Sequence, residues 1–343
     1  MRAAFRIGLL GYGNVGRAFA RRVTTDASRL ESAAGRPIII EGIGVARDLG
    51  RTAPAPITNS EAIVERKDLD AVVELIGGRD PARSYIDAAL RSGRQVITAN
   101  KQLIATAGPA LARLGPLRFE AAVGSAIPIV EVMAETLGTD RISSVTGILN
   151  GTTNFMLQRM GEGASYNAAL KEAQTAGMAE ADPSADVDAH DPAAKLAILI
   201  MLAFRQRITL PDLARSGIRG LSRRQIDHAT QKHCVIKLIA AAIQDGLGVR
   251  ADVRPRLVPA DHPFARVNGP LNAVSIVSRY SGELTLMGPG AGPDAAASAV
   301  VADVIRAARG VPASAGQLLS TIADQKPATI APLGATSPFP AAE

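Results

Sequence analysis

The polar residues best suited to chemistry gather in one short stretch in the middle of the chain. Between Gly177 and Lys195, four aspartates and one glutamate fall within twelve residues. Asp191 and Lys195 are four residues apart at the start of an apolar run, so a helix would place them on one face. One interpretation is a surface ion pair on a capped helix. The other is a lysine that donates a proton to a carbonyl oxygen, with Glu180 and Asp182 binding a substrate ammonium group.

Two other features near these residues carry weaker chemical signals. Asp186 and Asp188 have a spacing found among metal ligands, but no second ligand cluster accompanies them, so we expect no divalent metal site. Lys101 follows the short apolar run Gln95–Thr98. Ligands of open parallel sheets bind beyond the carboxyl ends of the strands, so this position suits a lysine that contacts a ligand. Taken alone, Lys101 would be a surface lysine.

A glycine-rich turn near the N-terminus is a candidate phosphate-binding site. Gly11, Gly13 and Gly16 form a G-x-G-x-x-G pattern directly after the apolar run Phe5–Leu10. In this pattern the first glycine allows a tight turn, the second admits a pyrophosphate, and the third lets the helix pack closely on the strand. Amide groups at the start of the helix then face the phosphates. The pattern predicts a dinucleotide site, and a βα turn without a ligand is the alternative.

The choice of nicotinamide cofactor is expected to depend on the residues after the second strand. An acid there binds the ribose 2′-hydroxyl of NAD, whereas an arginine accommodates the 2′-phosphate of NADP. Arg47 and Arg51 favour NADP, and Asp48 would favour NAD if the strand ended one residue later. We therefore expect NADP, with NAD as the alternative.

The pattern of apolar residues predicts two different architectures along the chain. Strands are expected at residues 5–10, 38–45, 71–76 and 95–98, with helices at 17–23 and 84–91. This alternation predicts an α/β fold with a Rossmann-type, doubly wound parallel sheet. After about residue 120, strands are expected at 141–149, 274–278 and 284–286, and helices at 167–175, 193–204, 223–244 and 295–309. This second part is expected to be an α+β domain with an antiparallel sheet.

The length of 343 residues suits two domains. We expect a dinucleotide-binding domain over residues 1–128 and a catalytic, substrate-binding domain over 129–292. Residues 293–310 are expected to return to the first domain. The stretch 326–343 is rich in Pro, Ala, Gly, Ser and Thr, which predicts an extended or flexible tail.

Composition narrows the class of protein. The 38 Lys and Arg are interleaved with 32 Asp and Glu, and aromatic residues make up only 3%, so we expect no nucleic-acid partner. The single cysteine, Cys234, excludes an internal disulfide. The longest apolar segment, Leu196–Phe204, is too short to span a bilayer, and the N-terminus lacks the features of a signal peptide. We expect a cytoplasmic protein with no membrane partner and a small-molecule substrate.

Several motifs, in order from Ile7 to about Arg309, resemble those of the homoserine dehydrogenase family. They are GLLGYGNVG at 8–16, ELIGG at 74–78 with PA at 81–82, TANK at 98–101, ILNGTTN at 148–154, the acidic stretch at 177–195, DHP at 261–263 and GPGAG at 288–292. The resemblance implies reduction of L-aspartate 4-semialdehyde to L-homoserine with NAD(P)H, in threonine and methionine biosynthesis.

The resemblance also implies roles for individual residues. Lys195 would be the proton donor, with Lys101 assisting at the substrate. Glu180 and Asp191 would orient the amino acid, and Asp182 would support them. Gly151 and Thr152 would also contact the substrate. The cofactor would be bound by Gly11, Gly13, Asn14, Val15, Gly16, Arg47, Arg51, Gly77, Lys101 and Gly292.

Two further expectations come from the resemblance alone. The family tends to hold a monovalent cation such as Na⁺ through backbone carbonyl groups. The matching positions are Glu120, Val123, Ser125 and Ile127. The family also implies a homodimer formed through the sheet of the second domain. The residues after Arg309 are too few for another domain with its own core, so we expect a short form without the regulatory ACT module of longer relatives.

Some residues depart from the family pattern. Met178 stands where an aromatic residue is common, and Ala189 stands where glycine is usual. If the backbone at Ala189 has a positive φ, the alanine is strained there. These departures leave open a relative that reduces a different small carbonyl compound. An alternative from another class is a dinucleotide-sensing regulator without turnover.

Overall fold

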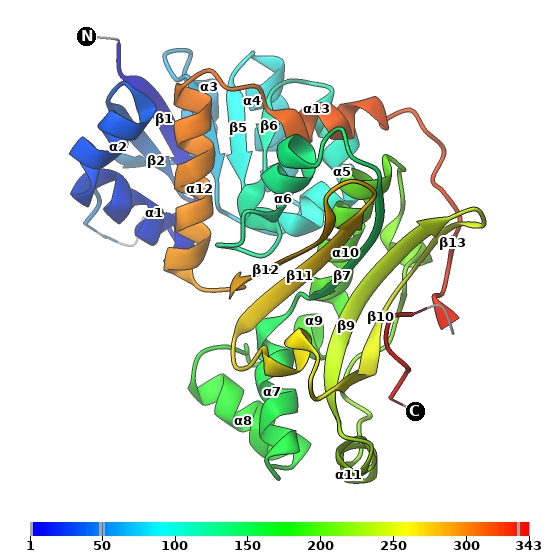
Figure 1. Cartoon of the computed structure of the whole chain (residues 1–343). Coiled ribbons are helices and arrows are strands. Elements are labelled where there is room, and N and C mark those ends of the chain that lie inside the picture. Colours follow the sequence, from blue (N-terminus) through cyan, green and yellow to red (C-terminus); the bar gives the residue numbers. More distant parts are fainter. Residues whose placement is uncertain (1–2, 48–49, 51, 335–336, 343) are drawn as a thin grey trace. The chain divides into compact units, whose positions relative to one another are not determined.

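The strands near the N-terminus form one parallel sheet in the order β3-β2-β1-β4-β5-β6. Figure 1 labels β1, β2, β5 and β6 of this sheet. They are β1 (Phe5–Leu10), β2 (Ile38–Gly44), β3 (Ile57–Thr58), β4 (Ala71–Glu74), β5 (Gln95–Thr98) and β6 (Leu117–Arg118). Every neighbouring pair is parallel. The strand order reverses at β1, which is where open α/β sheets bind ligands. The predicted Rossmann-type parallel sheet is confirmed.

Helices cover this sheet and complete the first folded unit, which comprises Met1–Thr136 and Gly292–Gln325. They are α1 (Asn14–Thr25), α2 (Ala27–Ala34), α3 (Ser60–Glu65), α4 (Ala82–Arg91), α5 (Lys101–Ala112), η1 (Glu120–Ala122), α6 (Ile129–Glu131), η2 (Val132–Thr136), α12 (Pro293–Ala308) and α13 (Ser314–Thr321). In the core, Ile7 of β1 and Phe19 of α1 pack in one cluster with Val300 and Val304 of α12. The late helix α12 thus belongs to the same core as the first strand and helix.

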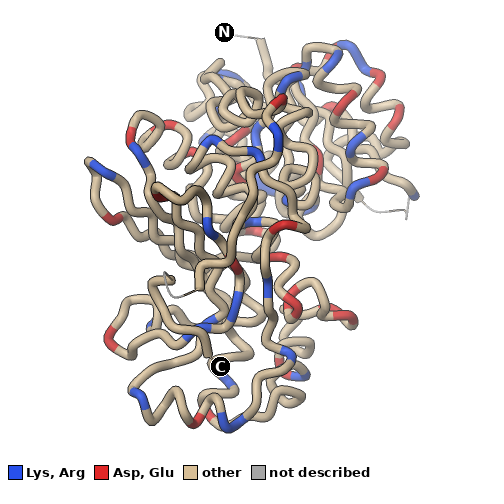
Figure 2. Tube along the Cα trace, turned by 90° about the vertical axis from the view of Figure 1, so that its right-hand side faces the viewer, with Lys and Arg blue, Asp and Glu red and all other residues tan. Residues whose placement is uncertain are grey.

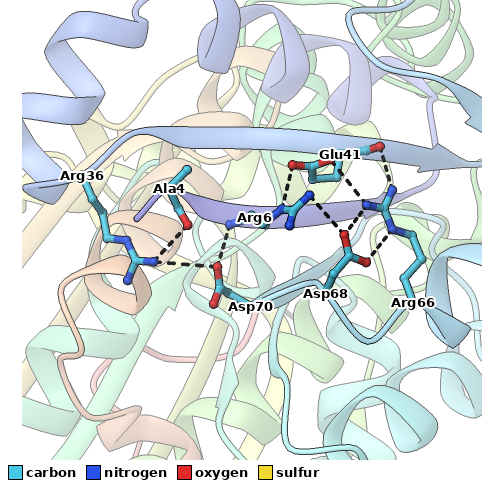
Figure 3. Close-up of polar contacts among 7 residues, drawn as sticks. All are labelled: Ala4, Arg6, Arg36, Glu41, Arg66, Asp68 and Asp70. Carbon is cyan, nitrogen blue, oxygen red and sulfur yellow. Dashed lines mark hydrogen bonds and ion pairs between the residues drawn. The ribbon is translucent and has the colours of Figure 1, made fainter. Parts of the chain in front are cut away.

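A network of charged side chains ties β1 and β2 to the loop before β4 (Figure 3). Arg6 bonds Glu41 at 2.8 Å and Asp68 at 3.2 Å. Arg66 bonds Asp68 at 2.6 Å and Glu41 at 3.4 Å. The hydrogen bond from Arg66 is the main reason why the pKa of Asp68 falls to about 2. Three segments distant in sequence are therefore joined by alternating charges on the surface of this unit.

The second unit, Leu137–Ala291 with Lys326–Glu343, is built on a mixed sheet. Its strands follow the order β12-β11-β7-β9-β10-β13, and β8 also pairs with β10. They are β7 (Ile142–Ile148), β8 (Ala214–Arg215), β9 (Cys234–Asp245), β10 (Gly248–Pro259), β11 (Leu271–Ser278), β12 (Gly282–Pro289) and β13 (Ile330–Ala331). The five long strands are antiparallel, as predicted, whereas the two-residue strands β8 and β13 are parallel to β10.

Helices complete the second unit around this sheet. They are α7 (Gly151–Gly161), α8 (Tyr166–Thr175), α9 (Ser184–Val187), α10 (His190–Phe204), η3 (Leu210–Asp212), α11 (Arg223–Gln231) and η4 (Pro263–Arg266). Helix α10 packs against β7 and β9 and is buried along almost its whole length, which explains its continuous apolar sequence.

The prediction of one helix over 223–244 is wrong in its second half. Helix α11 ends at Gln231, and the residues from Cys234 to Asp245 form β9. This strand lies between β7 and β10 and is apolar on both faces. A run without alternation between apolar and polar residues has no period that separates a strand from a buried helix. The segment is a strand because it pairs with β10 along its whole length.

The C-terminal stretch for which we predict an extended or flexible tail is extended and held against the second unit. Ile330 and Ala331 pair with β10, and Leu333 and Phe339 lie in a core cluster with Ile239. Arg256, which is buried beside Asp252 at 2.5 Å, donates to the carbonyl oxygen of Phe339 at 2.9 Å. These contacts give the tail a fixed course over the sheet.

The structure, a computed structural model, describes residues 3–47, 50, 52–334 and 337–342. Figure 2 shows that basic and acidic residues are interspersed along both units. Within the described ranges, none of the helices combines the length and the apolar character of a membrane span.

Candidate active site

The predicted lysine and aspartate meet at the start of α10. Lys195 Nζ donates to Asp191 Oδ2 and to the carbonyl oxygen of Leu149, each at 2.7 Å. Lys195 is only 7% exposed and Asp191 only 8%. The exposed ion pair that one interpretation of the sequence predicts would leave both side chains in water. Here both side chains are buried and bonded to each other.

Asn150 holds the carboxylates of this cluster in place. It is the N-cap of α7, where its Oδ1 accepts from Thr153 N at 2.8 Å. Its Nδ2 donates to Asp186 Oδ1 at 2.6 Å and to Asp191 Oδ2 at 3.0 Å. One amide group therefore connects the end of β7, the start of α7, α9 and the start of α10.

Asp186 is a member of this cluster that sequence reasoning missed. Burial raises the pKa of its carboxyl group, and the nearby charge of Asp191 adds to this, while the hydrogen bond from Asn150 and the charge of Lys195 act in the opposite direction. The sequence offered Asp186 only as an unsupported metal ligand. A signal was present in Asn150, since an asparagine directly after a strand is a preferred N-cap and brings its amide to whatever lies beside the helix start.

The other predicted substrate residues lie at the start of α7 and in the loop before α9. Gly151 and Thr152 form the first turn of α7, and Thr152 Oγ1 donates to the carbonyl oxygen of Met178 at 2.9 Å. Glu180 and Asp182 are exposed. Asp182 Oδ1 accepts from the backbone N of Ser184 at 3.0 Å and from its Oγ at 2.5 Å, and these bonds lower the pKa of Asp182.

Ala189 has a left-handed backbone, with φ 63° and ψ 24°, at the N-cap of α10. A non-glycine residue pays a conformational cost in this region. The helix nevertheless starts there, and Ala189 is buried. The departure from the family's glycine therefore leaves the Asp191–Lys195 pair in place, at the cost of local strain.

The glycine turn in the first unit has the geometry that a dinucleotide needs. Gly11 has φ +94°, and a Cβ there would lie 2.7 Å from the backbone of Leu75. A Cβ on Gly16 would lie 2.2 Å from Gly11 O, so the helix packs directly on the turn. Among the described residues, none lies within 4 Å of a Cβ built on Gly13, and none caps α1 through its side chain. The described part of the chain thus leaves the space beside Gly13 open, next to the first residues of α1.

A second predicted cofactor segment is shaped by Glu74, which sequence reasoning missed. Its buried carboxylate accepts from Ile76 N at 2.7 Å, Gly77 N at 3.0 Å and Thr98 Oγ1 at 2.6 Å. Asn100 caps α5, whose first residue is Lys101, and donates to Gly78 O at 2.6 Å. These bonds bring the ends of β4 and β5 together at the carboxyl edge of the sheet.

Of the remaining cofactor candidates, the structure describes Arg47 and Gly292 but not Arg51. Arg47 is exposed shortly after the end of β2. Asp48 and Arg51 lie outside the described residues. Gly292 is the N-cap of α12, with φ +113°.

Known proteins resemble the chain over most of its length. Residues 128–305 match the family described as "Homoserine dehydrogenase", and residues 11–115 match "Homoserine dehydrogenase, NAD binding domain". A homoserine dehydrogenase of Corynebacterium glutamicum is 42% identical over 90% of this chain and 72% of its own length. The solved homoserine dehydrogenase of Thiobacillus denitrificans has a TM-score of 0.85 at 34% identity, over 95% of this chain and 76% of that one. A hyperthermophilic archaeal homoserine dehydrogenase in complex with NADPH has a TM-score of 0.77 at 26% identity, over 90% and 99% of the two chains.

Proposed function

The chain belongs to the homoserine dehydrogenase family, and from this premise we propose that it interconverts L-aspartate 4-semialdehyde and L-homoserine with Lys195 as the proton donor. The family and the oxidoreductase class predicted from the sequence motifs are confirmed by these similarities. The observation that carries the residue assignment is the buried Lys195 amine, held by Asp191 and by the carbonyl oxygen of Leu149.

The proposed chemistry uses Lys195 as a general acid. When bound, the reduced nicotinamide supplies a hydride to the aldehyde carbon. Lys195 donates a proton to the carbonyl oxygen as negative charge develops there, so the aldehyde becomes a primary alcohol. Asp191 and Leu149 O accept hydrogen bonds from the amine and fix its position. Asn150 in turn fixes Asp191.

The amino-acid end of the substrate would be bound by residues around α7 and α9. Glu180 and Asp182 present exposed carboxylates that suit an ammonium group. Gly151 and Thr152 would contact the substrate at the start of α7. Lys101 would assist as a second cation. Support for these roles comes from the family motifs in which the residues lie.

We propose NADP as the preferred cofactor, with NAD as the alternative. Support for a dinucleotide comes from the first unit, where the described residues leave the space beside Gly13 open and do not cap the start of α1 with a side chain. Gly77 and Gly292 would line the same edge. Arg47 supports the 2′-phosphate of NADP because it is exposed shortly after β2. Turnover with NADPH and NADH in parallel tests the preference.

A monovalent cation such as Na⁺ is proposed in the loop that carries Glu120, Val123, Ser125 and Ile127. Among the described residues, no N–H or O–H group donates to the carbonyl oxygens of Val123 and Ser125, although both residues are buried. Buried oxygens of this kind suit a cation bound by carbonyl groups. A higher melting temperature in NaCl than in tetramethylammonium chloride of equal ionic strength would support the site.

The assembly and location are also proposals. The family resemblance supports a homodimer through the sheet of the second unit, which sedimentation at several concentrations can test. The single free thiol, Cys234, is consistent with a reducing, cytoplasmic environment.

The decisive experiment compares Lys195→Ala with Lys171→Ala, which changes an exposed lysine on α8. Loss of the general acid is expected to lower kcat by about 10²–10⁴ while cofactor affinity stays near that of the wild type. Lys171→Ala should retain full activity. Normal turnover by Lys195→Ala would refute the assignment. A panel of small aldehydes shows whether aspartate semialdehyde or another carbonyl compound is preferred.

A further inference from the structure

Lys237 is a buried lysine that the proposed reaction does not use. It lies on β9 on the same side as Ile239 and Ala241, which belong to an apolar cluster. The residue is 3% exposed, and burial lowers its pKa to about 8. Its Nζ donates to Asn154 Oδ1 at 3.0 Å and to Val267 O at 2.5 Å. Burying an amine among apolar side chains is costly, so its contacts need an explanation.

Asn154 transmits the position of Lys237 to the turn over residues 267–271. An ammonium group can only donate, so Asn154 must turn its oxygen toward Lys237. The amide Nδ2 then faces the turn, where it lies 3.0 Å from Val267 O, 3.0 Å from Gly269 O and 3.3 Å from Leu271 O. The three carbonyl oxygens can only accept, so they favour the same orientation, and Lys237 and the turn together fix the amide of Asn154.

The same turn lies directly against the start of α7. A Cβ on Gly151 would lie only 2.6 Å from Pro270 O. Further along the same helix, Gln158 Oε1 accepts from Gly269 N at 2.8 Å. Any movement of Pro270 toward α7 would displace Gly151, and Asn150 next to it holds Asp191.

We propose that Lys237 is a positioning residue for the substrate side of the active site. Together with Asn154, it holds the turn 267–271 against Gly151 and so fixes the segment Asn150–Thr152. This inference rests on the proposed function, because it assigns the segment to the substrate and not to the cofactor.

The test measures homoserine oxidation by Lys237→Met, which keeps the length of the side chain and removes the charge. The KM for homoserine is expected to rise about tenfold, the size of effect when one hydrogen-bonded contact is lost, while the KM for NADP⁺ stays within about twofold. Lys232→Met, at an exposed lysine just before β9, is the matched control and should change neither value. Gln158→Met removes the bond from the turn to Gln158 and should raise the KM for homoserine alone, by about threefold.

The outcomes separate the two proposals. An unchanged KM for homoserine in Lys237→Met, or a parallel rise in both KM values, overturns the positioning role. If Lys237→Met does not fold, Gln158→Met decides: a rise confined to homoserine supports the role, and no rise overturns it. A wild-type protein that does not oxidise homoserine overturns the proposed function and this inference with it.

Discussion

Substituting Asn150 tests how the carboxylates beside Lys195 are held. The side chain caps α7 through Thr153 N and donates to Asp186 at 2.6 Å and Asp191 at 3.0 Å. Loss of the cap costs about 1 kcal/mol, and each hydrogen bond to a charged group contributes about 1.5–3 kcal/mol. Because these neighbouring contributions are coupled, we expect Asn150→Ala to lower the free energy of unfolding by about 4 kcal/mol.

The same substitution should lower activity as well as stability. A loss of this size corresponds to a melting temperature roughly 10 °C lower for a unit of this size. Asp191 loses the amide that fixes it, so the Lys195 ammonium is less well placed, and kcat should fall roughly 10- to 100-fold. Thermal and urea unfolding, together with steady-state kinetics, measure both effects.

Asn150→Asp sharpens the test because it keeps the capping oxygen and replaces the donor with a third carboxyl group. Close to Asp186 and Asp191, a third carboxyl group raises the carboxyl pKa in the folded protein, because like charges disfavour ionisation. The folded state then binds a proton that the unfolded state releases above about pH 4, so stability falls as pH rises. We expect the stability of Asn150→Asp relative to Asn150→Ala to decrease steadily between about pH 5 and pH 8.

Asn59 provides the matched control. It caps α3 by accepting from Ala62 N at 2.7 Å, and it is exposed. Asn59→Ala should cost only the cap, about 1 kcal/mol, and Asn59→Asp should be nearly neutral. If Asn150→Ala costs no more than Asn59→Ala, or if Asn150→Asp shows no dependence on pH, the described role of Asn150 is incorrect.

Two further predictions concern parts of the fold away from the active site. Phe339→Ala removes a buried ring that packs edge-on against His262, with the ring centroids 4.8 Å apart, so we expect the free energy of unfolding to fall by about 3–5 kcal/mol. Pro332→Ala, at an exposed position of the tail, should change it by no more than about 0.5 kcal/mol. Equal melting temperatures for the two variants would show that the tail is not docked. Asp68→Asn should destabilise the protein near neutral pH, because the Arg66 hydrogen bond lowers the pKa of Asp68 to about 2. This contribution to stability is present above the unfolded pKa near 3.8 and is lost as the pH falls toward 2. The free energies of unfolding of wild type and variant should therefore converge as the pH falls through this range. A constant difference between them would contradict the ion-pair explanation.

The features that the sequence predicts correctly depend on interactions between residues that are close together in the chain. The glycine turn, the parallel strands of the first unit and the pairing of Asp191 with Lys195 depend on residues at most six positions apart or on the local alternation of strands and helices. Such features leave periodic or motif signals in the chain. Even the strain at Ala189 could be anticipated from the motif, and its φ of 63° agrees with that expectation.

The sequence by itself determined the class of fold and most of the residues that the proposed chemistry needs. Only the tertiary structure decided that Lys195 is buried, that Asn150 holds Asp191 from 41 residues away, and that Glu74 joins β4 to Thr98 on β5. It also made 234–245 a strand and fixed the course of the tail. The physical reason is that burial and long-range hydrogen bonds depend on which elements meet. A single segment with apolar residues on both faces could pack in several different ways. A lone amide after a strand could likewise find several different hydrogen-bond partners.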